Sequence, residues 1–306
     1  MPLGFPVRAS LALVVLLLPG APAPAQAPVA TPAAEAPPPA GALAACDAHW
    51  ARRAEGAEGA RAKPAEIDAA LDACRKAGEE APDSLEPRWK LMRALYFKGE
   101  YTTDDPGRQK TIFDEGRKAG EEARGVMRRL AARSTARAEK ASPAELADAL
   151  KGNRDAVATF LWSAVDWGKW ALAFGKSAAI KQGAAAKIRD DAAAVVRMDP
   201  SFEDAGGHRV LGRLHHQTPS VPFFTGWASR SDALANLEKA YKIAPKNFIN
   251  RLYLADALWE YEKSRRDEAR RMLEELVADT PSPEYIVEDR KTQDEARALL
   301  TTWKTR

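Results

Sequence analysis

The chain has 306 residues, of which 45% are hydrophobic and 29% are charged. This composition is typical of a soluble globular protein and argues against a membrane-embedded one. The formal net charge is only +3, and basic and acidic residues alternate along the sequence, so we expect no nucleic-acid-binding surface. Ala, Leu, Arg, Lys and Glu dominate while runs of alternating β-branched residues are scarce, which favours helices.

The first 25 residues have the features of an export signal. Arg8 precedes an apolar run that ends at Leu18 and is shorter than the roughly 20 residues that span a bilayer. Small residues follow, and cleavage after Ala25 would leave Gln26 as the first residue of an exported protein. Residues 26–44 are nearly all Ala and Pro, so we expect a disordered linker there and a helical domain over 45–306.

The chain has two cysteines, Cys46 and Cys74, which admit two interpretations. The sequence LAAC that ends at Cys46 matches a lipobox, which would make Cys46 a lipid anchor. A long Pro-rich segment separates it from the apolar run, however, and a lipobox adjoins that run. We therefore favour a disulfide, because an exported protein is oxidised and the two cysteines fall on consecutive, antiparallel predicted helices.

An internal repeat is the strongest signal in the sequence. In four segments, small or apolar residues at intervals of four and three share one helix face, and a proline that ends the helix follows. The segments are Ala70, Cys74, Ala77 and Pro82; Ile188, Ala192, Val195 and Pro200; Ala233, Leu237, Ala240 and Pro245; and Ala269, Leu273, Leu276 and Pro281.

Each repeat has a helix with a second regular pattern beside it. Its eighth position holds a small residue, at Gly168, Gly212 and Ala255, which we expect where the two helices of a pair touch. Arg93 takes this position in the helix that contains Trp89 and fits it poorly. The pattern resembles tetratricopeptide (TPR) repeats. We therefore predict an all-α, TPR-like superhelix of helical hairpins.

Three of the four histidines lie close together, at His208, His215 and His216. The first two are seven residues apart, about 10.5 Å along a helix, which is too far for one shared zinc ion. Adjacent histidines point about 100° apart and do not chelate together. We expect structural histidines, with a local hydrogen bond from Asp204 to His208, and no metal or other cofactor.

The resemblance to TPR proteins implies a concave groove, to which fixed positions of each first helix contribute. Carried over, these positions give a candidate ligand-binding set of Trp162, Lys169, Arg209, Arg213 and His216. Two arginines on one face suit a carboxylate ligand, although a solvated face explains them equally well. Three further aromatic residues follow in an inserted loop that would close over a cavity: Phe223, Phe224 and Trp227.

Three segments together resemble the TatT, or T-component, family of periplasmic TRAP transporters: FLWSAVDWGKWALAFGK (160–176), DPSFEDAGGHRVLGRLHHQTP (199–219) and ALANLEKAYKIAP (233–245). The resemblance implies a periplasmic helical protein, a homotrimer in some members, that pairs with a solute-binding subunit. It also implies a cavity for small, partly apolar organic acids. Members of the family are often lipoproteins, and the displaced lipobox at Cys46 departs from that pattern.

The sequence therefore supports two alternative functions. One is a non-catalytic binding protein for organic-acid uptake, in which substitution of Trp162 or Arg213 by alanine would weaken ligand binding. The alternative is a generic secreted TPR scaffold that binds another envelope protein. We do not expect an enzyme, because the sequence holds no nucleophile–base pair at a recognisable spacing and no phosphate-binding loop.

Overall fold

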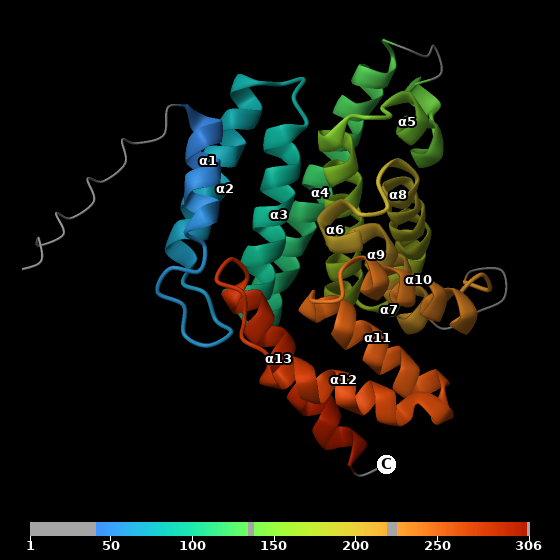
Figure 1. The fold of residues 1–306 in the computed structure, drawn as a ribbon. Coiled ribbons are helices and arrows are strands. Elements are labelled where there is room, and N and C mark those ends of the chain that lie inside the picture. Colours follow the sequence, from blue (N-terminus) through green and yellow to red (C-terminus); the bar gives the residue numbers. More distant parts are fainter. Residues whose placement is uncertain (1–40, 134–137, 219–224, 305–306) are drawn as a thin grey trace, which may run out of the picture. The chain divides into compact units, whose positions relative to one another are not determined.

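A computed structural model describes residues 41–133, 138–218 and 225–304 (Figure 1). These residues form thirteen α-helices and no β-strand, which confirms the predicted all-α fold of helical hairpins. The expected signal peptide, most of the expected linker, Phe223 and Phe224 lie outside the described residues. The first helix, α1, begins at Ala42.

Five hairpins follow one another along the chain, and each first helix packs along its second helix. The pairs are α1 (Ala42–Ala51) with α2 (Pro64–Glu80), α3 (Glu86–Tyr101) with α4 (Pro106–Ala131), α6 (Arg154–Phe174) with α8 (Ala184–Met198), α9 (Phe202–Gln217) with α10 (Arg230–Ile243), and α11 (Phe248–Tyr261) with α12 (Arg266–Ala278). Two short helices, α5 (Pro143–Ala149) and α7 (Lys176–Lys181), lie between these, and α13 (Ile286–Trp303) follows the last pair.

Local sequence signals set where the helices begin and end. The helices α2, α8, α10 and α12 each end two or three residues before the proline of the repeat, as that spacing predicts. At the other end, Asn153 and Asn247 cap α6 and α11 by accepting a backbone N–H. Ser142 and Glu145 form a capping box at α5.

The repeat positions of the second helices are buried against the first helices. Ala233, Leu237 and Ala240 on α10 are fully buried, as are the corresponding residues of α12. Gly212 on α9 lies directly over Leu237, where an added Cβ would come within 2.6 Å of the Leu237 Cγ. A glycine is needed there because any side chain would separate α9 from α10.

The prediction for Gly168 is wrong, whereas Ala255 is fully buried as expected. A Cβ added at Gly168 would meet no heavy atom within 4 Å. Instead, α6 packs on α8 through a different part of its surface, which includes Ala164 and Trp167. The predicted contact of α6 with α8 therefore lies about one turn too far along α6, because its position was taken from the pattern of α9.

The first hairpin is closed covalently. Cys46 on α1 and Cys74 on α2 form a disulfide, with their Cα atoms 5.1 Å apart. Both side chains are almost completely buried. The sulfur of Cys46 is therefore occupied by a bond within the chain, and a lipid attached to it would first require that bond to be broken.

The last helix, α13, links the C-terminal hairpins to the N-terminal ones (Figure 1). Near its beginning, Val287 joins a core cluster with Ile67 and Phe97, and Glu288 accepts a hydrogen bond from Arg53 at 2.9 Å. Near its end, Trp303 stacks on Trp259 of α11, with ring centres 4.3 Å apart. The position of α13 thus depends on contacts with residues more than 200 positions away in the sequence.

Candidate ligand-binding face

The first helices of consecutive hairpins meet along one face, which we call the inner face. Between α3 and α6, the Trp89 Nε1 donates to Asp155 at 2.9 Å, and the rings of Tyr96 and Trp162 lie 5.6 Å apart. One further turn along, Lys169 Nζ lies 2.6 Å from a Glu100 carboxylate oxygen. The two helices therefore run side by side with matching positions in contact.

The same arrangement continues between α9 and α11. Arg209 donates to Asn250 at 3.1 Å, Arg213 donates to Asp256 at 2.7 Å, and His216 Nε2 lies 3.0 Å from Glu260. The three residues predicted on α9 thus share one face and point toward the next first helix. Each is engaged by a protein group.

Charged side chains from three helices gather where α13 joins the inner face. Glu100 on α3 forms ion pairs with Lys169 on α6 and Lys291 on α13. Burial by itself would raise the pKa of Glu100, but the two ammonium groups outweigh it and lower this pKa to about 2. Lys169, one of the residues predicted to bind ligand, is therefore neutralised by a partner within the protein.

One basic residue of the inner face lacks such a partner. The Arg93 guanidinium lies 3.9 Å from the ring centre of Trp50 and 4.9 Å from that of Trp89. Within the described part of the chain it makes no ion pair, and its buried Nε has no hydrogen-bond acceptor. Burial lowers the pKa of Arg93 to about 10, so it remains charged at neutral pH.

A second unsatisfied donor lies close by. The Nε1 of Trp162 is buried and has no acceptor among the described residues. The contacts of α3 with α6 place Trp162 beside Tyr96, one turn along from Arg93. A buried N–H without an acceptor costs about 1–3 kcal/mol, so both donors would gain from a bound acceptor.

Sequence reasoning missed Arg93 as a site residue. The sequence does contain a sign of it, because Arg93 occupies a position at which the other first helices carry Gly or Ala. In the structure the close approach of α3 to α4 occurs instead at Gly99, where an added Cβ would lie 2.4 Å from the Phe113 ring. Arg93 is thereby free to face Trp50 and Trp89.

Trp227 does not join the inner face. Its ring packs edge-on against His215 at 5.1 Å, and the Arg189 guanidinium of α8 lies 4.9 Å from its centre. His215 and His216 point in different directions from α9, as adjacent residues of a helix must. The aromatic residue predicted to close over a ligand therefore lies against α8, away from Trp162.

The histidines take part in separate contacts. His208 Nδ1 lies 2.9 Å from the Asn236 side-chain oxygen on α10, and the Ser229 backbone N–H donates to His215. The hydrogen bond expected from Asp204 to His208 is not formed, because the Asp204 carboxylate accepts from Asn247 instead. No group of three or more potential metal ligands occurs among the residues that the structure describes.

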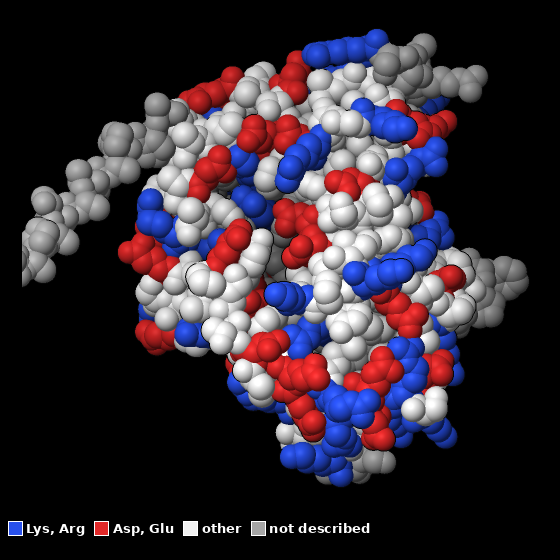
Figure 2. All heavy atoms as spheres, viewed as in Figure 1, with Lys and Arg blue, Asp and Glu red and all other residues white. Residues whose placement is uncertain are grey.

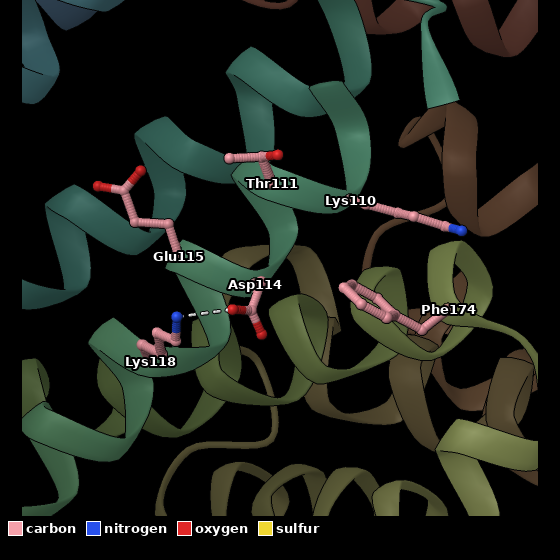
Figure 3. Close-up of a pocket in the computed structure, with 6 residues that line it drawn as sticks. All are labelled: Lys110, Thr111, Asp114, Glu115, Lys118 and Phe174. Carbon is pink, nitrogen blue, oxygen red and sulfur yellow. Dashed lines mark ion pairs between the residues drawn. The ribbon is translucent and has the colours of Figure 1, made fainter. Parts of the chain in front are cut away.

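A separate exposed area lies at the end of α6 and on α7. Leu172, Phe174 and Ile180 are exposed there, with Leu172 at 76% of its full accessible surface. Phe174 also lines a shallow pocket of about 360 Å³ beside α4 (Figure 3). The pocket's α4 residues carry both signs of charge, and Lys118 pairs with Asp114 across one turn (Figure 3).

No protein-family model matches the chain, and no curated protein is similar to it in sequence. Among the described helices, none combines the length and apolar character needed to cross a membrane. The geometry of the inner face is therefore the main guide to function.

Proposed function

We propose that this protein is a non-catalytic, TPR-like periplasmic binding protein that supports TRAP-type uptake of small organic acids. The observation that carries the proposal is Arg93, a half-buried guanidinium between two indole rings that has no acidic partner in the described chain. In this proposal the ligand's carboxylate binds Arg93, and the neighbouring rings of Trp50 and Trp89 contact its apolar part.

The chemistry of the site suits such a ligand. A guanidinium presents forked donors that match the two oxygens of a carboxylate. The inner-face cations that were predicted to bind ligand are already engaged within the protein. Lys169 and Arg213 have carboxylate partners, and Arg209 donates to Asn250. Unlike these cations, Arg93 makes no ion pair within the described chain, and Trp162 offers a second N–H nearby.

Calorimetry with a panel of small carboxylates tests this proposal. We expect Arg93→Met to weaken binding by about 10- to 150-fold, the value of one charge-assisted hydrogen bond. Trp162→Phe keeps an aromatic ring but removes the N–H, so a smaller loss is expected. Arg75→Met is the matched control, because Arg75 is an exposed residue on α2 with acidic partners.

Equal affinity in the wild type and in both inner-face variants would exclude Arg93 and Trp162 as the binding site. Circular dichroism should show unchanged helix content in every variant, since neither side chain holds a helix end. A comparison with Asp256→Asn is informative as well, because that change releases Arg213 from its ion pair and should create a second free guanidinium.

The cellular part of the proposal rests on residues 1–25 and on the resemblance to the TatT family. Cell fractionation should find the protein in the periplasm, and sequencing of its N-terminus should begin at Gln26. Light scattering tests the expected homotrimer. Retention of the first 25 residues in the cytoplasm would contradict export.

A scaffold function is a second candidate, favoured by the exposed cluster of Leu172, Phe174 and Ile180. Neighbouring exposed apolar residues of this kind often mark a protein-binding surface. The partner would be a solute-binding subunit or another envelope protein. In this case Leu172→Glu should abolish co-elution with the partner while carboxylate binding is unchanged, whereas Arg93→Met should leave co-elution intact.

A further inference from the structure

The end of the α6–α8 hairpin concentrates apolar side chains on the surface. Leu172, Phe174 and Ile180 are three of the five large hydrophobic residues that are exposed in the described part of the chain, and one span of nine residues contains them. Ile180 keeps 59% of its full accessible surface. We call residues 172–181 the α6–α7 tip. A partner that covered this tip would remove apolar surface from water.

Two glycines set the shape of the α6–α7 tip. Gly175 ends α6 with a φ angle of 87°, and Gly183 precedes α8 with a φ angle of 64°. Glycine adopts a positive φ without the steric cost that a side chain would add. The chain therefore turns at both ends of α7, and this short helix has no buried residue.

The tip carries positive charge that no acid of the described chain balances. Residues 167–189 contain five Lys and Arg residues and no Asp or Glu. Three of the five pair with acids outside this range, but Lys176 and Lys181 on α7 are exposed and make no ion pair within the described residues. Elsewhere both signs of charge lie side by side, as Figure 2 shows for one face of the molecule. The tip therefore departs from the mixed pattern.

The acids that share a pocket with Phe174 are already paired. Asp114 and Glu115 line this pocket on α4, and each forms an ion pair with a basic residue of α4 or α2 (Figure 3). Lys110 also lines it, with its Nζ 5.8 Å from the centre of the Phe174 ring, and makes no ion pair in the described chain. Cations without an acidic partner thus flank the exposed apolar side chains.

Leu172 and Phe174 leave α6 in different directions. They are two residues apart, so their side chains point about 200° apart around the helix. Phe174 stacks on Trp170 and lies beside α4, whereas Leu172 points away from that side. A rigid protein surface contacts one side of such a tip, whereas the fluid interface of a lipid bilayer surrounds it. The geometry therefore favours lipid over a protein partner at this tip.

We propose that the α6–α7 tip docks on a lipid surface that carries anionic headgroups. Its three exposed apolar side chains enter the boundary between headgroups and acyl chains, where such side chains are favourable. Lys176 and Lys181, together with Lys110, stay at the level of the headgroups and attract their negative charge. The contact is peripheral, and it is independent of the proposed carboxylate site at Arg93.

Co-sedimentation with lipid vesicles tests this proposal. The protein is used from Gln26 onward, so that the apolar N-terminal run adds no lipid affinity. One kind of vesicle is phosphatidylcholine alone, and the other is an equal mixture of phosphatidylcholine and phosphatidylglycerol. We expect at least about tenfold tighter binding to the mixed vesicles, since each lysine near an anionic surface contributes about fivefold. Raising sodium chloride from about 0.1 M to about 1 M should remove most of this preference, because the Debye length falls from about 10 Å to about 3 Å.

Substitutions in the tip separate its apolar and electrostatic contributions. Leu172→Glu should weaken binding to the mixed vesicles by about tenfold or more, because a charge replaces an inserted apolar side chain. Lys181→Gln should weaken it by about fivefold and leave binding to phosphatidylcholine unchanged. Ile243→Glu and Lys242→Gln are the matched controls, because these neighbouring residues are exposed on α10, outside the tip. Both controls should bind like the wild type, and circular dichroism should show the same helix content in all four variants.

Three results would overturn the proposal. The first is a wild type that binds neither kind of vesicle, which would leave the exposed cluster to a protein partner. The second is equal binding to both kinds of vesicle without an effect of salt. The third is an equal loss in the tip variants and the α10 controls, because lipid binding would then be a general property of the surface. Arg93→Met should bind vesicles like the wild type, so the outcome is separate from that of the small-acid proposal.

Discussion

The hairpins α9–α10 and α11–α12 differ from helices α3, α4 and α6 in how they satisfy their buried polar groups. In the described residues from 184 to 278, each buried side-chain nitrogen and oxygen atom has a hydrogen-bond partner. In contrast, α3 and α6 contain the unpartnered Nε of Arg93, the Nε1 of Trp162 and both carboxylate oxygens of Asp166. The C-terminal hairpins thus satisfy their own buried polar atoms, whereas α3 and α6 contain buried polar atoms without a hydrogen-bond partner.

This difference teaches that regular repeats and functional positions occupy different parts of the chain. The hairpins with the most regular spacing use their polar residues to hold neighbouring first helices together, as Arg213 does with Asp256. Where the spacing is irregular, at Arg93, the side chain does not pack between paired helices and makes no ion pair within the described chain. Natural proteins often depart from local rules where a site is located.

Among changes that test the difference between the two regions, loss of the disulfide in the first hairpin is expected to have the largest effect on stability. Replacing both Cys46 and Cys74 by alanine should lower the free energy of unfolding by about 3 kcal/mol, because the loop they close is no longer constrained in the unfolded chain. Hydrogen exchange measured by mass spectrometry should become faster in α1, α2 and α3 than in α9 to α12. Uniformly faster exchange in all helices would show that the two regions do not differ in local stability.

A smaller loss is expected when a regular hairpin is disturbed. Gly212→Ala would push a methyl group against Leu237 and should cost about 1–3 kcal/mol in urea unfolding. Gly168→Ala is its control on the irregular side, because its added methyl group meets nothing. That change should stabilise the protein by about 0.5–1 kcal/mol, since alanine favours a helix. Equal effects of the two changes would contradict the packing described for α9 and α10.

Asp166 gives the smallest expected effect, and one that depends on pH. This carboxyl group lies against Gly116 of α4 and is completely buried, and its burial raises its pKa well above the ordinary value. In the unfolded chain it loses its proton near pH 4, so stability of the wild type falls as pH rises from there toward the folded-state pKa. Asp166→Asn lacks this titration.

The stability advantage of Asp166→Asn should therefore grow between pH 4 and pH 7. Chemical denaturation at the two pH values measures it. Asp191 is a useful comparison, because it is equally buried but is paired with Arg124 and Ser163. A constant difference between wild type and Asp166→Asn would mean that the buried carboxyl group has another partner.

Sequence reasoning predicted most of the fold because the relevant signals are local. The repeat spacing identified α2, α8, α10 and α12, and the following prolines gave their ends. The TPR analogy assigned Trp162 and Arg213 to a groove-facing side, and in the structure each contacts the neighbouring first helix. Each of these features depends on residues within one or two turns of a helix.

The rest depends on contacts that no local pattern encodes. Glu203, Asp204 and Ala205 have positive φ angles at the beginning of α9, and nothing in their identities predicts this left-handed turn. Arg209 and Asn250 hold it by donating to its carbonyl oxygens. The wrong hydrogen bond predicted from Asp204 to His208 has the same cause, since the turn directs Asp204 toward Asn247 instead. The partnerless state of Arg93 likewise emerges only when α1, α3 and α13 come together.

The helix α13 has a consequence for how this protein can change in evolution. Tandem arrays ordinarily gain or lose whole units with little penalty, since each unit contacts only its neighbours. Here Lys291 reaches back to Glu100 and Glu288 to Arg53, so the number of hairpins between them is fixed by the span that α13 bridges. Duplication of a hairpin would pull these ion pairs apart, and we expect relatives to diversify by substitution rather than by changes in repeat number.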